Sequence, residues 1–200
     1  MKRYCLYLFI LIGISCSAEL KAQKNGTIYK GNDPAVRYTG RTLVSPDGSV
    51  AFDWVGTYLE TRFTGGKLSV KVSETGTSYY NVFVDGKLHK VVKVCGTDTL
   101  IHLVSGIDKR IHSLKIQKRS EGEFGKTTVH QFVLSGSGRL AEEPAVRTRH
   151  IEFIGNSLTC GYGTDGKHRD EPFLVETENC NLTFASMVAR YYDADYTLIA

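Results

Sequence analysis

The chain has 200 residues, of which 42% are hydrophobic and 23% charged, and its formal net charge is +4. These values are ordinary for a globular protein and exclude a disordered or fibrous chain. The length allows one or two domains. The excess of positive charge is not gathered into a basic face, so nothing indicates binding to nucleic acid. We expect the basic run at residues 118–120 to be a solvated strand end.

The beginning of the chain has the order of a secretory signal peptide. Lys2 and Arg3 precede an apolar run over residues 4–15, and small and polar residues follow. The run is shorter than the roughly 20 residues that a membrane-spanning helix needs. We expect cleavage after Ala22, or else after Ala18, and therefore a secreted, periplasmic or cell-surface protein.

The alternative is a lipoprotein signal in which Cys16 carries the lipid. Gly13 stands where such signals usually have a large aliphatic residue, and this disfavours the alternative. Only a lipid on Cys16 would attach the protein to a membrane. Removal of residues 1–22 leaves 22 basic and 20 acidic residues, so the remaining chain is close to neutral.

Three cysteines remain after residue 22, namely Cys95, Cys160 and Cys180. An odd number cannot be fully paired within one chain. Cys160 and Cys180 can form a disulfide in an oxidising compartment, but spacing alone does not settle this. No two cysteines form a CxxC pair, so we expect no structural zinc site.

Residues 23–138 are predicted to form an all-β, jelly-roll-like sandwich. Leu68–Val72 alternates apolar and polar residues, as a half-buried strand does. Asp85-Gly86 joins two further strands as a hairpin, because this dipeptide adopts the positive φ angles of a two-residue turn. Glycine-containing turns separate the rest, and no helical period appears. The other strands are expected at residues 80–84, 88–94, 100–104, 111–118 and 129–134.

A linker is predicted at residues 139–149, and an incomplete α/β domain after it. Pro144 cannot continue a helix or a central strand. Strands are expected at 151–154 and 195–199, with a helix over 182–192 capped by Asn179 or Asn181. Strand, helix, strand is a βαβ unit, which implies a parallel sheet. Since residues 150–200 are too few for a complete α/β domain, we expect a truncated chain with exposed apolar surface after residue 150.

Ser157 is the candidate catalytic residue. It follows the strand at 151–154 and Gly155, so it lies at the carboxyl edge of the sheet, where open α/β sheets have their sites. A serine hydroxyl there can attack a carbonyl if a base accepts its proton, and the serine N–H can stabilise the oxyanion. The nucleophile elbow of α/β-hydrolases is excluded, because Thr159 stands where that motif requires glycine.

The block Gly155–Gly163, GNSLTCGYG, resembles the first block of the SGNH or GDSL hydrolases. Together with the preceding IEFI it is more specifically similar to carbohydrate esterase family 2. The resemblance implies a jelly-roll β-sandwich ahead of an SGNH hydrolase domain, and removal of O-acetyl groups from plant polysaccharides such as xylan or glucomannan. Ser157 would be the nucleophile and its N–H one oxyanion donor. Asn156 replaces the more frequent aspartate, which leaves the hydrogen bonding of the serine loop open.

The same resemblance places the catalytic histidine and the other oxyanion donors beyond residue 200. The fragment alone is therefore expected to be inactive. No cofactor and no metal is implied, and the expected partner is an acetylated polysaccharide or oligosaccharide. Two alternatives remain open: a carbohydrate-binding or adhesion protein that relies on the β-sandwich, and an SGNH esterase acting on another acyl ester.

Several other motifs have weaker interpretations. Gly161–Gly166 matches GxGxxG, but no helix is predicted directly after it, as a dinucleotide site requires. His168 is eleven residues from Ser157 and is expected to lie at the mouth of the cleft or to have no role. Cys160 is expected to be structural. Acidic residues and His168 on one loop predict a solvated charge cluster rather than a metal site (Asp170, Glu171, Glu176, Glu178). Aromatic side chains of the β domain suggest either core packing or a sugar platform (Trp54, Tyr58, Tyr79, Tyr80).

Overall fold

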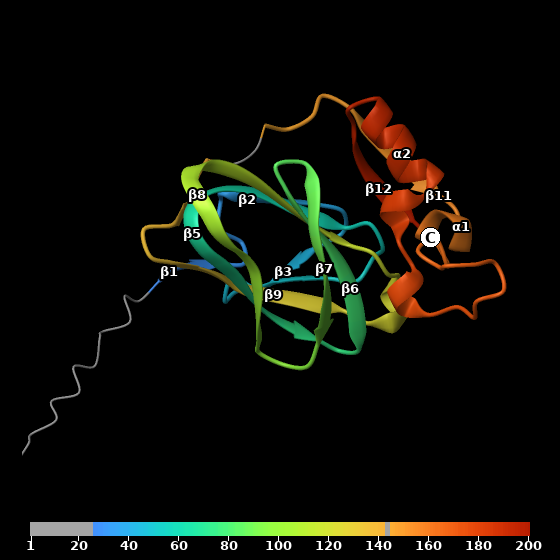
Figure 1. Cartoon of the computed structure of the whole chain (residues 1–200), viewed down its shortest axis with the longest axis horizontal. Coiled ribbons are helices and arrows are strands. Elements are labelled where there is room, and N and C mark those ends of the chain that lie inside the picture. The colour runs from blue at the N-terminus through green and yellow to red at the C-terminus, as the bar shows by residue number, and fades with distance from the viewer. Residues whose placement is uncertain (1–25, 143–144) are drawn as a thin grey trace, which may run out of the picture.

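The structure is a computed structural model that describes residues 26–142 and 145–200. The predicted signal peptide, including Cys16, lies outside these residues. The described part is mostly β-sheet with few helices (Figure 1). The strands are β1 (Thr27–Lys30), β2 (Val36–Thr39), β3 (Leu43–Val44), β4 (Val50–Phe52), β5 (Tyr58–Glu74), β6 (Thr77–Val84), β7 (Lys87–Cys95), β8 (Thr99–Lys118), β9 (Thr127–Ser135), β10 (Arg139–Leu140), β11 (His150–Ile154) and β12 (Asp195–Ile199). The helices are α1 (Ser157–Cys160) and α2 (Phe184–Tyr191), with 3-10 turns η1 (Gly122–Phe124), η2 (Val175–Thr177) and η3 (Cys180–Leu182).

In the described part of the chain, ten strands form one sheet in the order β3-β4-β9-β5-β8-β6-β7, with β1 on β9 and with β2 and β10 on β5. All of these pairs are antiparallel. Two long strands, β5 of 17 residues and β8 of 20, run through the whole sheet. The first half of β5 pairs with β2, and the second half pairs with β9. The sheet therefore folds over on itself around one core.

The fold in β5 comes at a glycine pair. Its register with β8 shifts between Thr64 and Ser69, and Gly66 has a φ of +83°, which a residue with a side chain rarely adopts. The strand predicted at Leu68–Val72 is the second half of β5. The strands predicted at 100–104 and 111–118 are one strand, β8, so the break expected between them is wrong.

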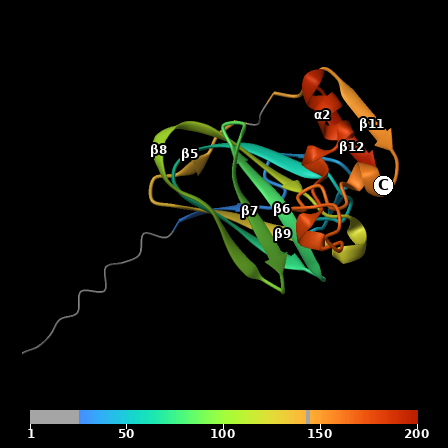
Figure 2. The ribbon, with the colours of Figure 1, turned by 45° about the vertical axis from the view of Figure 1, so that its right-hand side comes forward.

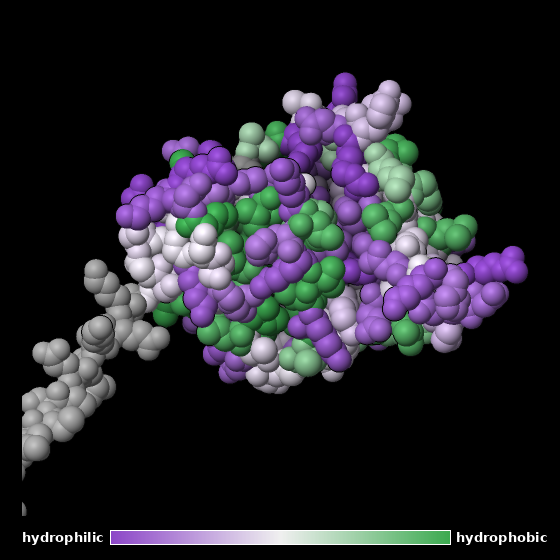
Figure 3. Space-filling model, in the orientation of Figure 1, coloured by the Kyte–Doolittle hydropathy of each residue, from purple (hydrophilic) through white to green (hydrophobic). Residues whose placement is uncertain are grey.

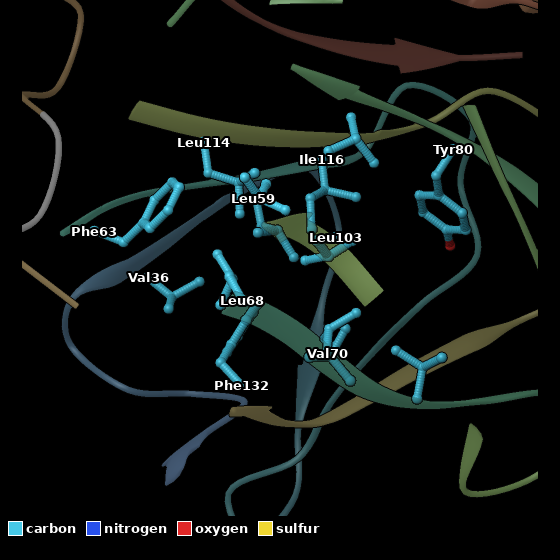
Figure 4. Close-up of a cluster of buried hydrophobic side chains, with 14 of the residues drawn as sticks. Val36, Leu59, Phe63, Leu68, Val70, Tyr80, Leu103, Leu114, Ile116 and Phe132 are labelled. Atoms are coloured by element: carbon cyan, nitrogen blue, oxygen red, sulfur yellow. The ribbon is translucent and has the colours of Figure 1, made fainter. Parts of the chain in front are cut away.

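The core inside the folded sheet is apolar and fully buried (Figure 4). The alternation of β5 places Leu68, Val70 and Val72 in it, as predicted. The hairpin is confirmed as well, since Val84 pairs with Lys87 across Asp85 and Gly86, whose φ angles are 50° and 74°. Other members with large and fully buried side chains are Leu59, Phe63, Leu103, Leu114, Phe132 and Leu134.

Residues 118–120 are not a solvated strand end. Lys118 and Ser120 are 0% exposed and Arg119 is 3% exposed. The reason is that the C-terminal part of the chain covers this end of β8. The Nε of Arg119 donates a hydrogen bond of 3.1 Å to the carbonyl of Glu178, 59 residues away. The expected charged end is therefore part of an interface.

The C-terminal part has a strand, two helices and a second strand. β11 and β12 are parallel, with His150 opposite Asp195 and Ile154 opposite Ile199. The helix predicted at 182–192 is shorter, because residues 180–182 form η3, and the side chain of Asn179 caps η3 by accepting from the N–H of Asn181. On α2, Ala185 and Ala189 are fully buried, whereas Val188 is 37% exposed.

The opposite side of this part is apolar and exposed. Ile154 is 79% exposed, Leu158 76% and Tyr191 83%. Figure 3 shows apolar surface over α2. The exposure predicted for residues after 150 is thus confirmed. The other exposed large apolar side chains of this part are Tyr162, Phe173, Leu174, Leu182, Phe184, Met187, Val188 and Tyr192.

None of the helices in residues 26–142 and 145–200 is both long and apolar enough to cross a lipid bilayer.

A second apolar cluster joins the C-terminal part to the sheet. Val55 and Tyr58 of the β domain pack there against Tyr196 and Leu198 of β12. Gly56, with a φ of +73°, lies against Leu198, and a Cβ on it would meet the Leu198 Cδ1 at 2.7 Å. Both parts of the chain therefore share one packed interface.

Candidate active site at Ser157

Ser157 lies where β11 ends, as predicted. The N–H of Gly155 still donates to the carbonyl of Ile199 on β12, at 2.9 Å, and the chain then turns into α1, whose first residue is Ser157. The serine is exposed. A serine at the carboxyl end of a parallel strand and at the first position of a helix is positioned to meet a ligand outside the sheet edge.

The turn before the serine depends on a small residue. A Cβ on Gly155 would lie 2.0 Å from the Oγ1 of Thr159, whose side chain is buried beneath the turn. Asn156 is the N-cap of α1: its Oδ1 accepts from the N–H of Leu158 at 3.1 Å, and its carbonyl accepts from Thr159 at 2.7 Å. The asparagine thus supplies the hydrogen bonding that the sequence left open.

This capping leaves the serine N–H for a ligand. The first N–H groups of a helix have no partner within the helix. Asn156 satisfies those of Leu158 and Thr159 but not that of Ser157, which stands beside the exposed hydroxyl. A hydroxyl and an N–H on one residue are the two groups that acyl transfer needs at its nucleophile.

Gly161 ends α1 and anchors the following loop. It has a φ of 88° and its N–H donates to the carbonyl of Ser157 at 2.9 Å. Its own carbonyl accepts from the N–H of Asn179 at 3.0 Å. A Cβ at this position would lie 2.6 Å from the Asn179 carbonyl oxygen. The close approach of the two backbones therefore requires glycine.

The β domain contacts the serine block through Glu121. Its carboxylate accepts hydrogen bonds from the hydroxyl of Tyr162 and, at 3.6 Å, from the thiol of Cys160. Phe124 of η1 stacks on Phe173 with ring centroids 5.7 Å apart, and Phe173 stacks on Tyr162 at 4.3 Å. In Figure 2 the loop between α1 and α2 lies against η1. The β domain thus supports the chain that follows Ser157.

Glu178 is buried rather than part of a solvated cluster, so the prediction is wrong for this residue. Its side chain is 0% exposed, and its Oε1 accepts from the N–H of Glu121 at 3.1 Å. Burial, and secondarily the charge of Glu121, raises the pKa of Glu178 to about 8. His168, Asp170 and Glu176 are exposed, as predicted.

Among the described residues, one group offers ligand atoms close enough for a metal ion: Glu121, Cys160 and Glu178, within 4.8 Å of one another. Burial raises the pKa of the Cys160 thiol to about 12, and the two carboxylates add to this effect. This thiol is therefore not an activated nucleophile. Cys160 and Cys180 are both free thiols, so the disulfide considered above is not formed.

The other candidate residues predicted from the sequence do not form a site with Ser157. His168 lines a separate hollow with Arg169 and Phe173. Within residues 26–142 and 145–200, no histidine is hydrogen-bonded to the serine. The glycines of Gly161–Gly166 lead into a loop and not into a helix, so the dinucleotide motif is excluded.

The aromatic platform is not formed as a set. Tyr58 and Tyr80 are 1% and 3% exposed and belong to the two apolar clusters. Trp54 is partly exposed, and the guanidinium of Arg41 lies 5.0 Å from its ring centroid. Tyr79 is partly exposed, and its hydroxyl donates to Glu176 at 3.2 Å.

The family of the chain is shown by comparison with known proteins. The family described as "Carbohydrate esterase 2 N-terminal" matches residues 38–144. The chain therefore belongs to carbohydrate esterase family 2, whose N-terminal domain is the folded sheet described above.

Curated relatives of the chain are named as esterases, in agreement with this family. The chain is 32% identical over 169 residues to the cellulase/esterase CelE of Acetivibrio thermocellus, covering 84% of this chain and 21% of that protein. It is 27% identical over 169 residues to an acetylxylan esterase / glucomannan deacetylase of Cellvibrio japonicus, covering 84% of this chain and 47% of the relative. It thus spans about half the length of these relatives, or less.

Solved structures have the same fold. A family two carbohydrate esterase from Clostridium thermocellum, in complex with cellohexaose, matches with a TM-score of 0.79 and 33% identity, over 82% of this chain and 50% of that chain. A family two carbohydrate esterase from Cellvibrio japonicus matches with a TM-score of 0.76 and 25% identity, over 86% and 51%. Both matches extend beyond the residues of the N-terminal family, into those that carry Ser157.

Proposed function

We propose that this protein is a secreted serine esterase that removes O-acetyl groups from plant polysaccharides such as xylan or glucomannan. Residues 150–200 would belong to an SGNH hydrolase domain that follows a jelly-roll sandwich at 23–138 and a linker at 139–149. The observation that carries the proposal is the exposed Ser157 at the carboxyl end of β11, with its N–H left without a partner by the cap. Relatives named as acetylxylan esterases support the substrate class.

In the proposed mechanism the Ser157 oxygen attacks the acetyl carbonyl and forms an acyl-serine, and the sugar hydroxyl leaves. Water then attacks the acyl group, which releases acetate and restores the serine. The N–H of Ser157 donates to the oxyanion in both steps. A histidine C-terminal to residue 200 accepts the serine proton and returns it to the sugar oxygen.

The test is acetate release by the full-length protein from acetylated xylan and acetylated glucomannan. Ser157→Ala is expected to lower acetate release by at least about 1,000-fold. Ser137→Ala, an exposed serine of the loop before β10, is the matched control and should retain full activity. Acetate release that survives Ser157→Ala would refute the assignment. Activity on other acyl esters alone, abolished by Ser157→Ala, would show that the proposed substrate is wrong and the nucleophile right.

A second function is binding of polysaccharide without hydrolysis. It is favoured by the match to the structure in complex with cellohexaose, and by a match, with 27% identity and a TM-score of 0.64, to a carbohydrate esterase described as having divergent catalytic and non-catalytic binding functions. Affinity electrophoresis in gels that contain soluble glucans, and co-sedimentation with insoluble glucans, measure it. Retention that is equal in wild type and Ser157→Ala, with no acetate release by either, would favour binding over catalysis.

A further inference from the structure

We infer that Glu121, Cys160 and Glu178 form a binding site for a thiophilic divalent cation of the Zn²⁺ class, between the β domain and the serine helix. The three residues come from three separate segments: the end of β8 before η1, helix α1, and the loop before η3. Their ligand atoms lie within 4.8 Å of one another. The inference does not rest on the esterase function.

The distance between two of the ligand atoms suits a metal ion with tetrahedral coordination. The Sγ of Cys160 is 3.6 Å from the Oε2 of Glu121. Zinc binds thiolate sulfur at about 2.3 Å and carboxylate oxygen at about 2.1 Å, and a tetrahedral angle then separates the two ligand atoms by about 3.6 Å. A hydrogen bond from the thiol now joins these two atoms.

Glu178 provides independent evidence for a cation at this cluster. Its side chain is 0% exposed, and its Oε2 has no hydrogen-bond partner among the described residues. A buried carboxylate oxygen without a partner costs free energy, so such atoms are rare in folded proteins. A cation shared with Glu121 and Cys160 would satisfy it.

The neighbouring cations do not fill this role. Arg119 is paired with Asp165 and with the carbonyls of Glu176 and Glu178. The Nζ of Lys118 donates to the carbonyls of Ser120 and Glu121, at 2.9 and 3.1 Å. Neither reaches the Glu178 Oε2.

Glu121 can be reached from solvent. A hollow open to solvent is lined by Glu121 together with Asp53, Trp54 and Glu123. Its acidic rim would raise the local concentration of cations. Tyr162, whose hydroxyl is bonded to Glu121, is 40% exposed and stands at the surface of the cluster.

Binding of the cation releases protons and requires no oxidation or reduction. The S–H bond of Cys160 breaks as the sulfur–metal bond forms, and its proton passes to solvent. A proton on Glu178, where present, is released in the same way. The thiolate and two carboxylates then leave one tetrahedral position for water.

The test uses Co²⁺ as a spectroscopic probe and Zn²⁺ as competitor, in a Cys95→Ser background that removes the exposed thiol. We expect one Co²⁺ per chain, with thiolate-to-cobalt charge-transfer absorption that Zn²⁺ abolishes. Cys160→Ser should remove this absorption and weaken Zn²⁺ binding by at least about 100-fold. Cys180→Ser is the matched control: it is an equally buried thiol whose Sγ donates to the Lys118 carbonyl, and it should keep the absorption.

Glu178→Gln keeps the shape of the side chain. If Cys160→Ser does not fold, this second variant tests the metal site. It should weaken Zn²⁺ binding by at least about 10-fold while circular dichroism stays unchanged. Absorption that survives Cys160→Ser, or Zn²⁺ affinity equal in Glu178→Gln and wild type, would overturn the inference. So would the absence of stoichiometric binding in the wild-type chain, which would mean that the cluster is held by its own hydrogen bonds alone.

Discussion

The hydroxyl of Tyr58 on β5 donates a hydrogen bond of 2.6 Å to Asp195, the first residue of β12. Arg37 of β2 and Arg147 also donate to this carboxylate, each at 2.7 Å. Both arginines are paired with Glu60 as well. Strand β12, and through it the strand that leads to Ser157, is thus tied to the β domain by a nearly buried charge network.

Asp195→Asn should destabilise the protein by about 3 kcal/mol, because it leaves two arginines facing one carboxylate in a nearly buried site. The matched control is Asp193→Asn. Asp193 is 90% exposed, bonds only the Nε of Arg147 and has a φ of 47°, which asparagine also tolerates. Its effect should stay within about 0.5 kcal/mol. Urea unfolding followed by circular dichroism measures both, and equal losses would contradict the network.

His112 should make stability depend on pH near neutrality. It is 2% exposed, and although burial favours the neutral ring, hydrogen bonds to Asp85 at 2.7 Å and Asp108 at 3.0 Å raise its pKa. A raised pKa means that its stabilising contribution is complete below the unfolded value of about 6.5 and is lost as pH rises through the folded value.

The measurement is the difference in unfolding free energy between wild type and His112→Gln at a series of pH values. Taking the difference removes the other groups that titrate in this range. The advantage of wild type should be largest below about pH 6 and should shrink as pH rises. A difference that is constant with pH would show that His112 stays in one protonation state.

Gly155→Ala should disturb the turn that presents Ser157, because the new methyl group would overlap the buried Oγ1 of Thr159. We expect a loss of about 2 kcal/mol. Adding Thr159→Ala removes that oxygen and should recover part of the loss. Gly163→Ala is the control: its Cβ would meet no atom within 4 Å, so only its φ of 68° costs free energy, about 1 kcal/mol. Thermal denaturation of the three variants and the wild type checks this, and a double variant no better than Gly155→Ala would refute the clash.

Leu198→Ala should cost about 3 kcal/mol, because Leu198 is 1% exposed and fills the space over Gly56 in the second cluster. Leu158→Ala removes the same atoms from a side chain that is 76% exposed and should change stability by less than about 0.5 kcal/mol. The comparison is made by chemical denaturation. Similar values for the two would mean that the interface does not contribute to the stability of the chain.

Local signals made part of this structure predictable. Asp85-Gly86 has turn chemistry that few other dipeptides share, and residues 151–154 and 195–199 are short apolar runs of strand length. The block around Ser157 is distinctive enough to make this serine the candidate nucleophile. These features each depend on residues close together in the sequence.

What the sequence did not reveal depends on contacts between distant residues. Arg37 and Asp195 are 158 positions apart, and the burial of Glu178 comes from its contact with Glu121 and Arg119 of the other part of the chain. A charged residue that becomes buried only when two parts of a chain meet has the same local pattern as a solvated one. The same reason explains the wrong expectation for residues 118–120.

The backbone pairing of Gly161 with Asn179 has a consequence for diversity. A second backbone hydrogen bond, from the N–H of Asp165 to the carbonyl of Thr177 at 3.0 Å, closes the same loop further along. The residues between Asp165 and Thr177 can change in number or type while these two backbone pairs hold the ends of the loop. The entropic cost of closing a longer loop grows only with the logarithm of its length. Evolution can therefore remodel the loop beside Ser157 while the helix that carries this serine stays in place.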